Sequence, residues 1–155
     1  MIRIYLMLIT LGILLSNCNG DTIPAGAHSF ENNSWSYDAK IPFEFELDDT
    51  SSVYDLVLVL RNTNDYKYSN LFVSIEEFPP YGESYKSQHE IPIANPDGSW
   101  IGNKSGSVIE NKYLVRRGTF PFIGKYKYSI QHAITDESVE EVMDLTLLLT
   151  KYNGN

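Results

Sequence analysis

Hydrophobic and polar residues alternate along much of the chain with a period of two, which is typical of β-strands that bury one face. The alternation is clearest in four segments, at residues 43–47, 71–76, 125–131 and 143–150. Residues 56–60, with the sequence Leu-Val-Leu-Val-Leu, are apolar at every position. Such a run predicts a strand at the centre of a sheet, with both faces covered.

Residues that favour turns separate these segments, at positions 78–82, 95–98 and 102–107. Shorter strands are expected at residues 87–94 and 113–117. We place the first of these at a sheet edge or a bulge, because Pro92 has no N–H to donate to a neighbouring strand. Residues 136–142 are the one stretch that would also fit a helical turn.

Seven or eight strands between turns, without a convincing amphipathic helix, predict an all-β fold. We expect a single antiparallel β-sandwich over residues 34–155, either a jelly roll or immunoglobulin-like. The chain has 11 Tyr, 7 Phe and 2 Trp residues, and most of them fall inside the strand patterns. Their large apolar area makes the core of the sandwich their expected place.

The N-terminal segment has the order of a secretory signal peptide: Arg3, then an apolar run at residues 4–15, then small polar residues. Cys18, the only cysteine, follows directly. We therefore interpret residues 1–17 as a lipoprotein signal peptide and Cys18 as the acylated first residue of the mature protein. The apolar run is too short for a membrane span, which needs about 20 residues. Two or three acyl chains, such as palmitate, would hold the protein at a membrane almost permanently.

Residues 18–33 are rich in Asn, Gly, Pro, Ser and Asp, which predicts a lipidated tether between the membrane and the domain. The formal net charge of the chain is −8, and removal of Arg3 with the signal peptide makes it more negative. Nucleic acid is not an expected partner, because its binding depends on Lys and Arg that neutralise phosphates. With Cys18 acylated, no thiol remains for a disulfide or a metal site.

No constellation of catalytic or metal-binding residues is evident. His28, His89 and His132 are isolated in the sequence. Neither Ser105 nor Ser107 is the serine of a Gly-x-Ser-x-Gly motif, the nucleophile elbow. We therefore expect no cofactor, no metal and no enzymatic activity.

Two alternatives concern residues in turns. The first is calcium binding, because acidic side chains lie in several turns, at Asp48, Asp49, Asp65 and Asp97. Their spacing matches no known calcium loop, and Asp is common in turns for conformational reasons alone. Trp100 and Tyr81 lie in or beside turns, where aromatic rings would stack on sugars. A glycan-binding surface lipoprotein is therefore the alternative function.

Residues 54–72, YDLVLVLRNTNDYKYSNLF, form the most distinctive segment. Together with the lipoprotein signal at Cys18, this segment resembles the gliding-motility lipoprotein family of Bacteroidetes, the GldH type. Residues 95–102 and 120–126 and Asp144 agree with the same pattern, so the resemblance covers nearly the whole mature chain.

The resemblance implies a membrane-anchored accessory of the gliding machinery, linked to type IX secretion and without assigned enzymatic residues. Residues 19–22 carry a single acid, which favours the periplasmic face of the outer membrane over surface export. The polar residues 61–65 and the aromatic residues near them are our candidates for docking on partner proteins. The candidates are Arg61, Asn62, Asn64, Asp65, Tyr66, Tyr68 and Trp100. The alternative is a connection between strands whose polar groups are satisfied within the domain.

Overall fold

The computed structural model describes residues 21–154, which contain eleven β-strands, one short 3-10 helix and no α-helix. The strands of the first half are β1 (Thr22–Ser29), β2 (Ser34–Ser36), β3 (Ile41–Leu47), β4 (Tyr54–Thr63), β5 (Asn70–Phe78) and β6 (Tyr85–Pro92), with the 3-10 helix η2 (Glu31–Asn33) after β1. The strands of the second half are β7 (Asn103–Ser105), β8 (Val108–Gly118), β9 (Gly124–His132), β10 (Ser138–Glu140) and β11 (Val142–Lys151). Three of them, β2, β7 and β10, have only 3 residues each.

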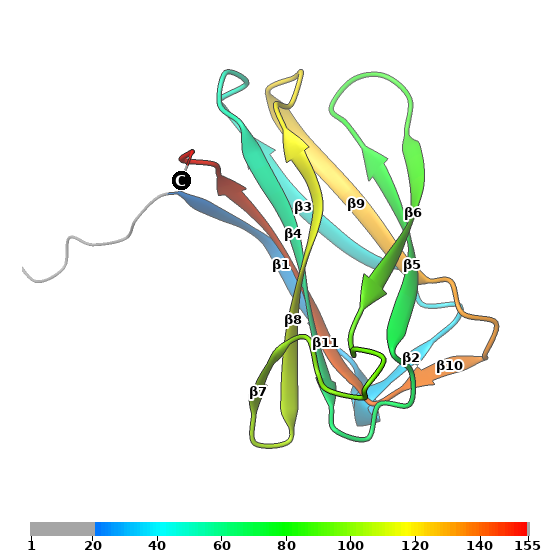
Figure 1. The fold of residues 1–155 in the computed structure, drawn as a ribbon. Coiled ribbons are helices and arrows are strands. Elements are labelled where there is room, and N and C mark those ends of the chain that lie inside the picture. The colour runs from blue at the N-terminus through cyan, green and yellow to red at the C-terminus, as the bar shows by residue number, and fades with distance from the viewer. Residues whose placement is uncertain (1–20, 155) are drawn as a thin grey trace, which may run out of the picture.

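The strands form two main sheets that lie face to face (Figure 1). One sheet has the order β1-β11-β4-β8-β7 and the other has the order β3-β9-β5-β6, while β2 and β10 pair separately. When the long strands alone are numbered along the chain, the sheets read 1-8-3-6 and 2-7-4-5. This arrangement is that of a jelly roll. The predicted antiparallel sandwich is confirmed, and the jelly roll is formed rather than the immunoglobulin-like alternative.

The core lies between the two sheets, and the predicted alternation fills it. Along β3, Phe43, Phe45 and Leu47 are each at most 4% exposed, whereas the intervening glutamates face water. The central position of β4, between β11 and β8, explains its continuous apolar run. Aromatic side chains supply much of the core, as expected: Phe45 stacks on Tyr126 with ring centroids 5.5 Å apart.

The N-terminal tether predicted over residues 18–33 is wrong from Thr22 onward, because residues 22–29 form β1 and pair with β11. Ala25 faces the core, and Phe30, just after the strand, is also buried. Pro24 is tolerated because β1 is an edge strand, and the ladder shifts register between Pro24 and Gly26. The predicted signal peptide and Cys18 lie outside the described residues.

Two further predictions need correction, and one is confirmed. Residues 138–140, within the stretch that would also fit a helical turn, form strand β10 against β2. Residues 103–105, within the predicted loop 102–107, form β7. These short strands raise the total above the seven or eight predicted. The edge position expected from Pro92 is confirmed, since β6 is the outermost strand of its sheet.

The sandwich has two distinct ends (Figure 1). At the end we call proximal, β1 begins, with Thr22 paired to Thr150, and β4 begins beside it, with Tyr54 paired to Lys151. The proximal end also carries the connections at residues 48–53, 79–84 and 119–123. The opposite end, which we call distal, carries the connections at residues 64–69, 93–102 and 133–137. The candidate docking residues lie at or beside the distal end.

Candidate functional site

Arg61, the first docking candidate, is bound within its own domain. Its guanidinium donates from Nε to both carboxylate oxygens of Asp144 at 2.9 Å, and Nη2 lies 2.5 Å from Oδ2. The two residues are brought together by the pairing of β4 with β11. The hydrogen bond to Asp144 raises the pKa of the Arg61 guanidinium. Because Asp144 is 5% exposed, Arg61 serves first to neutralise a buried carboxylate.

Asn62 is fully buried and belongs to the framework of the distal end. Its Oδ1 accepts a hydrogen bond from Asn111 Nδ2 at 2.8 Å, and its Nδ2 donates to the carbonyl of Thr63 at 2.9 Å. Gly102 lies directly over this pair, where a Cβ would collide with the Glu110 carbonyl and with Oδ1 of Asn111. The amide pair therefore joins β4 to β8, and the 93–102 connection packs closely over it at Gly102. Both side chains are buried, so they are not available to bind another protein.

Tyr66 is also buried, at 5% exposure, and its hydroxyl donates to the carbonyl of Asn70 at 3.0 Å. Burial raises the pKa of this tyrosine, so the hydroxyl stays protonated. The ring of Tyr68 packs edge-on against Tyr66 with centroids 5.8 Å apart, but Tyr68 itself is 38% exposed. Its hydroxyl donates to Asp136 Oδ2 at 2.5 Å. Tyr68 thus connects the 64–69 loop to the 133–137 connection.

Asn64, Asp65 and Lys67 are the exposed residues at the tip of the loop. Their backbone is held in place: the Asn64 N–H donates to the Ser107 carbonyl at 3.1 Å, and the Asp65 N–H donates to Thr63 Oγ1 at 3.1 Å. The structure gives the side chains of Asn64 and Asp65 no hydrogen-bond partner in the described part of the chain. Of the seven candidates, Asn64, Asp65 and Tyr68 therefore present exposed polar or aromatic surface on the loop, and Arg61 is 47% exposed beside it but paired with Asp144.

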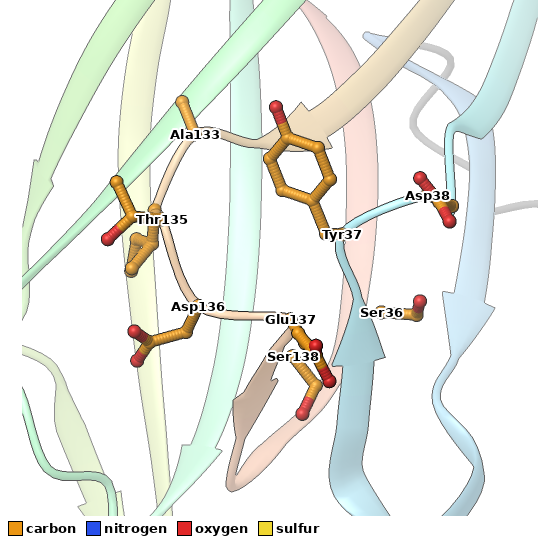
Figure 2. A pocket seen from close by; sticks show the side chains of 9 residues that line it. Ser36, Tyr37, Asp38, Ala133, Thr135, Asp136, Glu137 and Ser138 are labelled. Carbon is orange, nitrogen blue, oxygen red and sulfur yellow. The ribbon is translucent and has the colours of Figure 1, made fainter.

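An acidic groove of about 800 Å³ opens at the same end of the sandwich (Figure 2). One wall consists of residues 36–38, at and just after the end of β2, and the other is the connection between β9 and β10. The lining residues are Ser36, Tyr37, Asp38, Ala133, Ile134, Thr135, Asp136, Glu137 and Ser138. Three carboxylates line the groove, and Tyr68 reaches it through its hydrogen bond to Asp136. These lining residues were not among the predicted site residues, because the two walls are about a hundred positions apart and nothing local marks them as neighbours.

His132 lies behind the groove, 1% exposed, between the rings of Trp35 and Tyr37 at centroid distances of 5.4 and 5.5 Å. Neither ring nitrogen has a hydrogen-bond partner among the described residues. Burial lowers the pKa of His132, which favours the neutral imidazole. The histidine therefore packs as an uncharged aromatic side chain against the back of the groove.

Trp100 lies at the same end but does not form an open platform. It pairs in an isolated bridge with Ala94 and packs partly buried against the core. The N–H groups of Ile93 and Ala94 donate to the carbonyl of Ser69, which joins this connection to the 64–69 loop. Since Trp100 is mostly covered, it offers little surface on which a sugar could stack, whereas Tyr81 is 68% exposed at the opposite end.

Comparison with known proteins decides the family. The sequence model of the GldH lipoprotein family matches residues 23–147 of this chain, from β1 into β11. The chain belongs to the GldH family of gliding-motility lipoproteins. Within this family, "Gliding motility lipoprotein GldH homolog" of Christiangramia forsetii is 37% identical over 123 residues, which is 79% of this chain and 75% of that protein. "Gliding motility lipoprotein GldH" of Flavobacterium johnsoniae is 28% identical over 146 residues, which is 90% of this chain and 91% of that protein.

The match to the GldH family confirms the resemblance drawn from the sequence. It spans the strands that hold the buried amide pair, the 64–69 loop and all of the residues that line the groove. A lipoprotein is held at a membrane by its lipid, and among residues 21–154 there is no helix long and apolar enough to cross a bilayer. The same residues contain no group of three or more His, Cys, Asp or Glu side chains arranged to hold a metal ion.

Proposed function

We propose that this protein is a non-catalytic accessory of the gliding and type IX secretion machinery, held at the outer membrane and facing the periplasm. Acylated Cys18 is its anchor, and the β-sandwich acts through contacts with other proteins of the machinery. Membership of the gliding-motility lipoprotein family supports the motility role. The lipoprotein signal that precedes Cys18 supports the anchor.

The observation that carries the proposed docking role is the concentration of exposed polar groups at the distal end. Asn64 and Asp65 project from a loop whose backbone is fixed, and Tyr68 joins that loop to the acidic groove. A fixed loop loses little conformational entropy when it binds, which favours recognition. The carboxylates of Asp65, Asp136 and Glu137 are exposed on this surface, and a partner surface that carries Lys or Arg would be complementary to them.

The test substitutes Asn64→Ala and Asp65→Ala together in the full chain. Both side chains are exposed and lack hydrogen-bond partners in the described structure, so we expect normal abundance and folding. We expect spreading motility to be lost and crosslinking to neighbouring proteins to fall. The matched control is Glu46→Ala with Asp48→Ala, two exposed residues on the proximal half. Unchanged motility in the Asn64 and Asp65 variant would contradict the docking role, and so would a loss that merely follows reduced abundance.

A further inference from the structure

Exposed apolar side chains gather at the proximal end. Two of the connections there meet, because Tyr81 packs edge-on against Phe122 with ring centroids 5.7 Å apart. Pro80 also lies close over Gly124. The exposed fractions of the patch residues are Phe78 39%, Tyr81 68%, Tyr85 69%, Phe122 38% and Ile123 61%. We call these five residues the proximal patch.

The proximal patch carries little charge. Within the two connections that carry the patch, 79–84 and 119–123, Glu83 is the one charged residue, whereas the third proximal connection, 48–53, carries Asp48 and Asp49. Large apolar side chains that cluster on an uncharged surface indicate a contact with another apolar phase or protein. The distal loops differ in charge, since they present the exposed carboxylates of Asp65, Asp136 and Glu137.

The N-terminal chain limits what can cover this patch. The carbonyl of Asp21 accepts a hydrogen bond from the Lys151 N–H at 2.7 Å, which fixes Asp21 at the proximal end. Three peptide units separate Asp21 from Cys18, and they span at most about 11 Å when fully extended. An acyl chain attached to Cys18 therefore leaves the protein close to the proximal end and cannot reach the distal end, which is the length of a strand away.

We propose that the proximal patch rests on the bilayer interface, so that the domain stands on the membrane with its distal end pointing away. This inference rests on the proposed acylation of Cys18. Aromatic side chains such as Tyr favour the interfacial region, and Phe and Ile bury apolar area at the boundary of the acyl chains. Because the patch is nearly uncharged, the contact depends on apolar burial and persists at high salt.

The test measures immersion depth in the full acylated protein, reconstituted in phosphatidylethanolamine and phosphatidylglycerol vesicles. A nitroxide is attached to a new cysteine at Ile123→Cys, at Tyr85→Cys or, as the control, at Asn64→Cys. Acylation of Cys18 blocks its thiol from the reagent. Collision with a water-soluble nickel complex and with oxygen is then measured at low and high salt, and mass spectrometry establishes whether Cys18 carries its lipid.

The expected result is that labels at positions 123 and 85 collide several-fold less often with the nickel complex than the label at 64, and more often with oxygen. This difference should remain at high salt. If the protein is acylated and bound but all three labels are equally open to the nickel complex, the patch inference is overturned while the anchor stands. If Cys18 carries no lipid, the anchor fails and the patch inference fails with it.

Discussion

The two ends of the jelly roll use the same strands to present opposite surfaces. The proximal connections 79–84 and 119–123 expose uncharged apolar and aromatic side chains, such as Tyr81 and Ile123. The distal connections expose polar and acidic side chains above a framework of polar pairs, the buried Asn62 with Asn111 and the half-exposed Arg61 with the buried Asp144. The sandwich core fixes where the connections begin and end, while their composition decides what each end can contact.

Residues that are neighbours in the sequence of the distal end also differ in burial. Asn62 and Asn64 belong to the same distinctive segment, yet the first is fully buried and the second is exposed. A segment that is typical of a family therefore serves two purposes here. Its buried members hold the distal end in shape, and its exposed members are free for recognition.

The largest expected effect comes from the framework, at Gly102→Ala. The added methyl group would meet the Glu110 carbonyl, which is backbone and cannot move aside, so we expect a loss of about 3 kcal/mol in the free energy of unfolding. Urea denaturation measures it. Gly118→Ala, at the proximal end of β8, is the matched control, because its methyl group meets nothing within 4 Å. Equal stability of the two variants would show that the distal framework is not tightly packed.

A smaller effect is expected at Asn62→Ala, which leaves the buried Nδ2 of Asn111 without its acceptor. The expected loss of stability is about 2 kcal/mol, the usual cost of orphaning a buried polar group. The control is Asn64→Ala, which should change the free energy of unfolding by less than about 0.5 kcal/mol. If both asparagines cost the same, the distinction between framework and exposed residues within this segment is wrong.

The smallest effect is a pH dependence at the distal end. Burial lowers the pKa of His132 below its ordinary value, so the unfolded chain binds this proton more readily than the folded chain. Stability therefore rises with pH up to about 6.5, the ordinary pKa of histidine, and falls on acidification below it. His132→Leu should flatten this slope between about pH 5 and 7, and His89, whose pKa burial also lowers, retains the remainder.

Thermal denaturation across that range follows the slope of both proteins. Replacing a buried imidazole without hydrogen-bond partners by an apolar side chain should leave stability at neutral pH nearly unchanged. An identical slope in the variant would mean that His132 is not buried in its neutral form.

Much of the fold follows from local patterns in the sequence. The alternation of β3 and the apolar run of β4 were predictable because burial on one face or on both leaves a direct trace. The same alternation also predicts the burial of Asn62, because this residue continues the inward-facing positions of Leu58 and Leu60 along β4. Strand β1 was missed because Pro24 and Gly26 are more common in linkers than in strands, although an edge strand tolerates both.

Other features depend on contacts between distant parts of the chain. The choice between a jelly roll and an immunoglobulin-like sandwich is set by strand order, which local periodicity does not encode. The acidic groove forms where Tyr37 and Asp38 meet residues 133–138, and the pairing of Arg61 with Asp144 depends on the register of β11. That register shifts between Val142 and Asp144 through an irregularity with no sequence signature.

The most direct test of the account places a photoactivatable amino acid at position 64 or at position 123 of the full chain in living cells. We predict that illumination joins position 64 to another protein, whereas position 123 forms adducts with lipid and not with protein. A protein adduct at position 123, or the absence of any protein adduct at position 64, would contradict the assignment of one end to the membrane and the other to a partner.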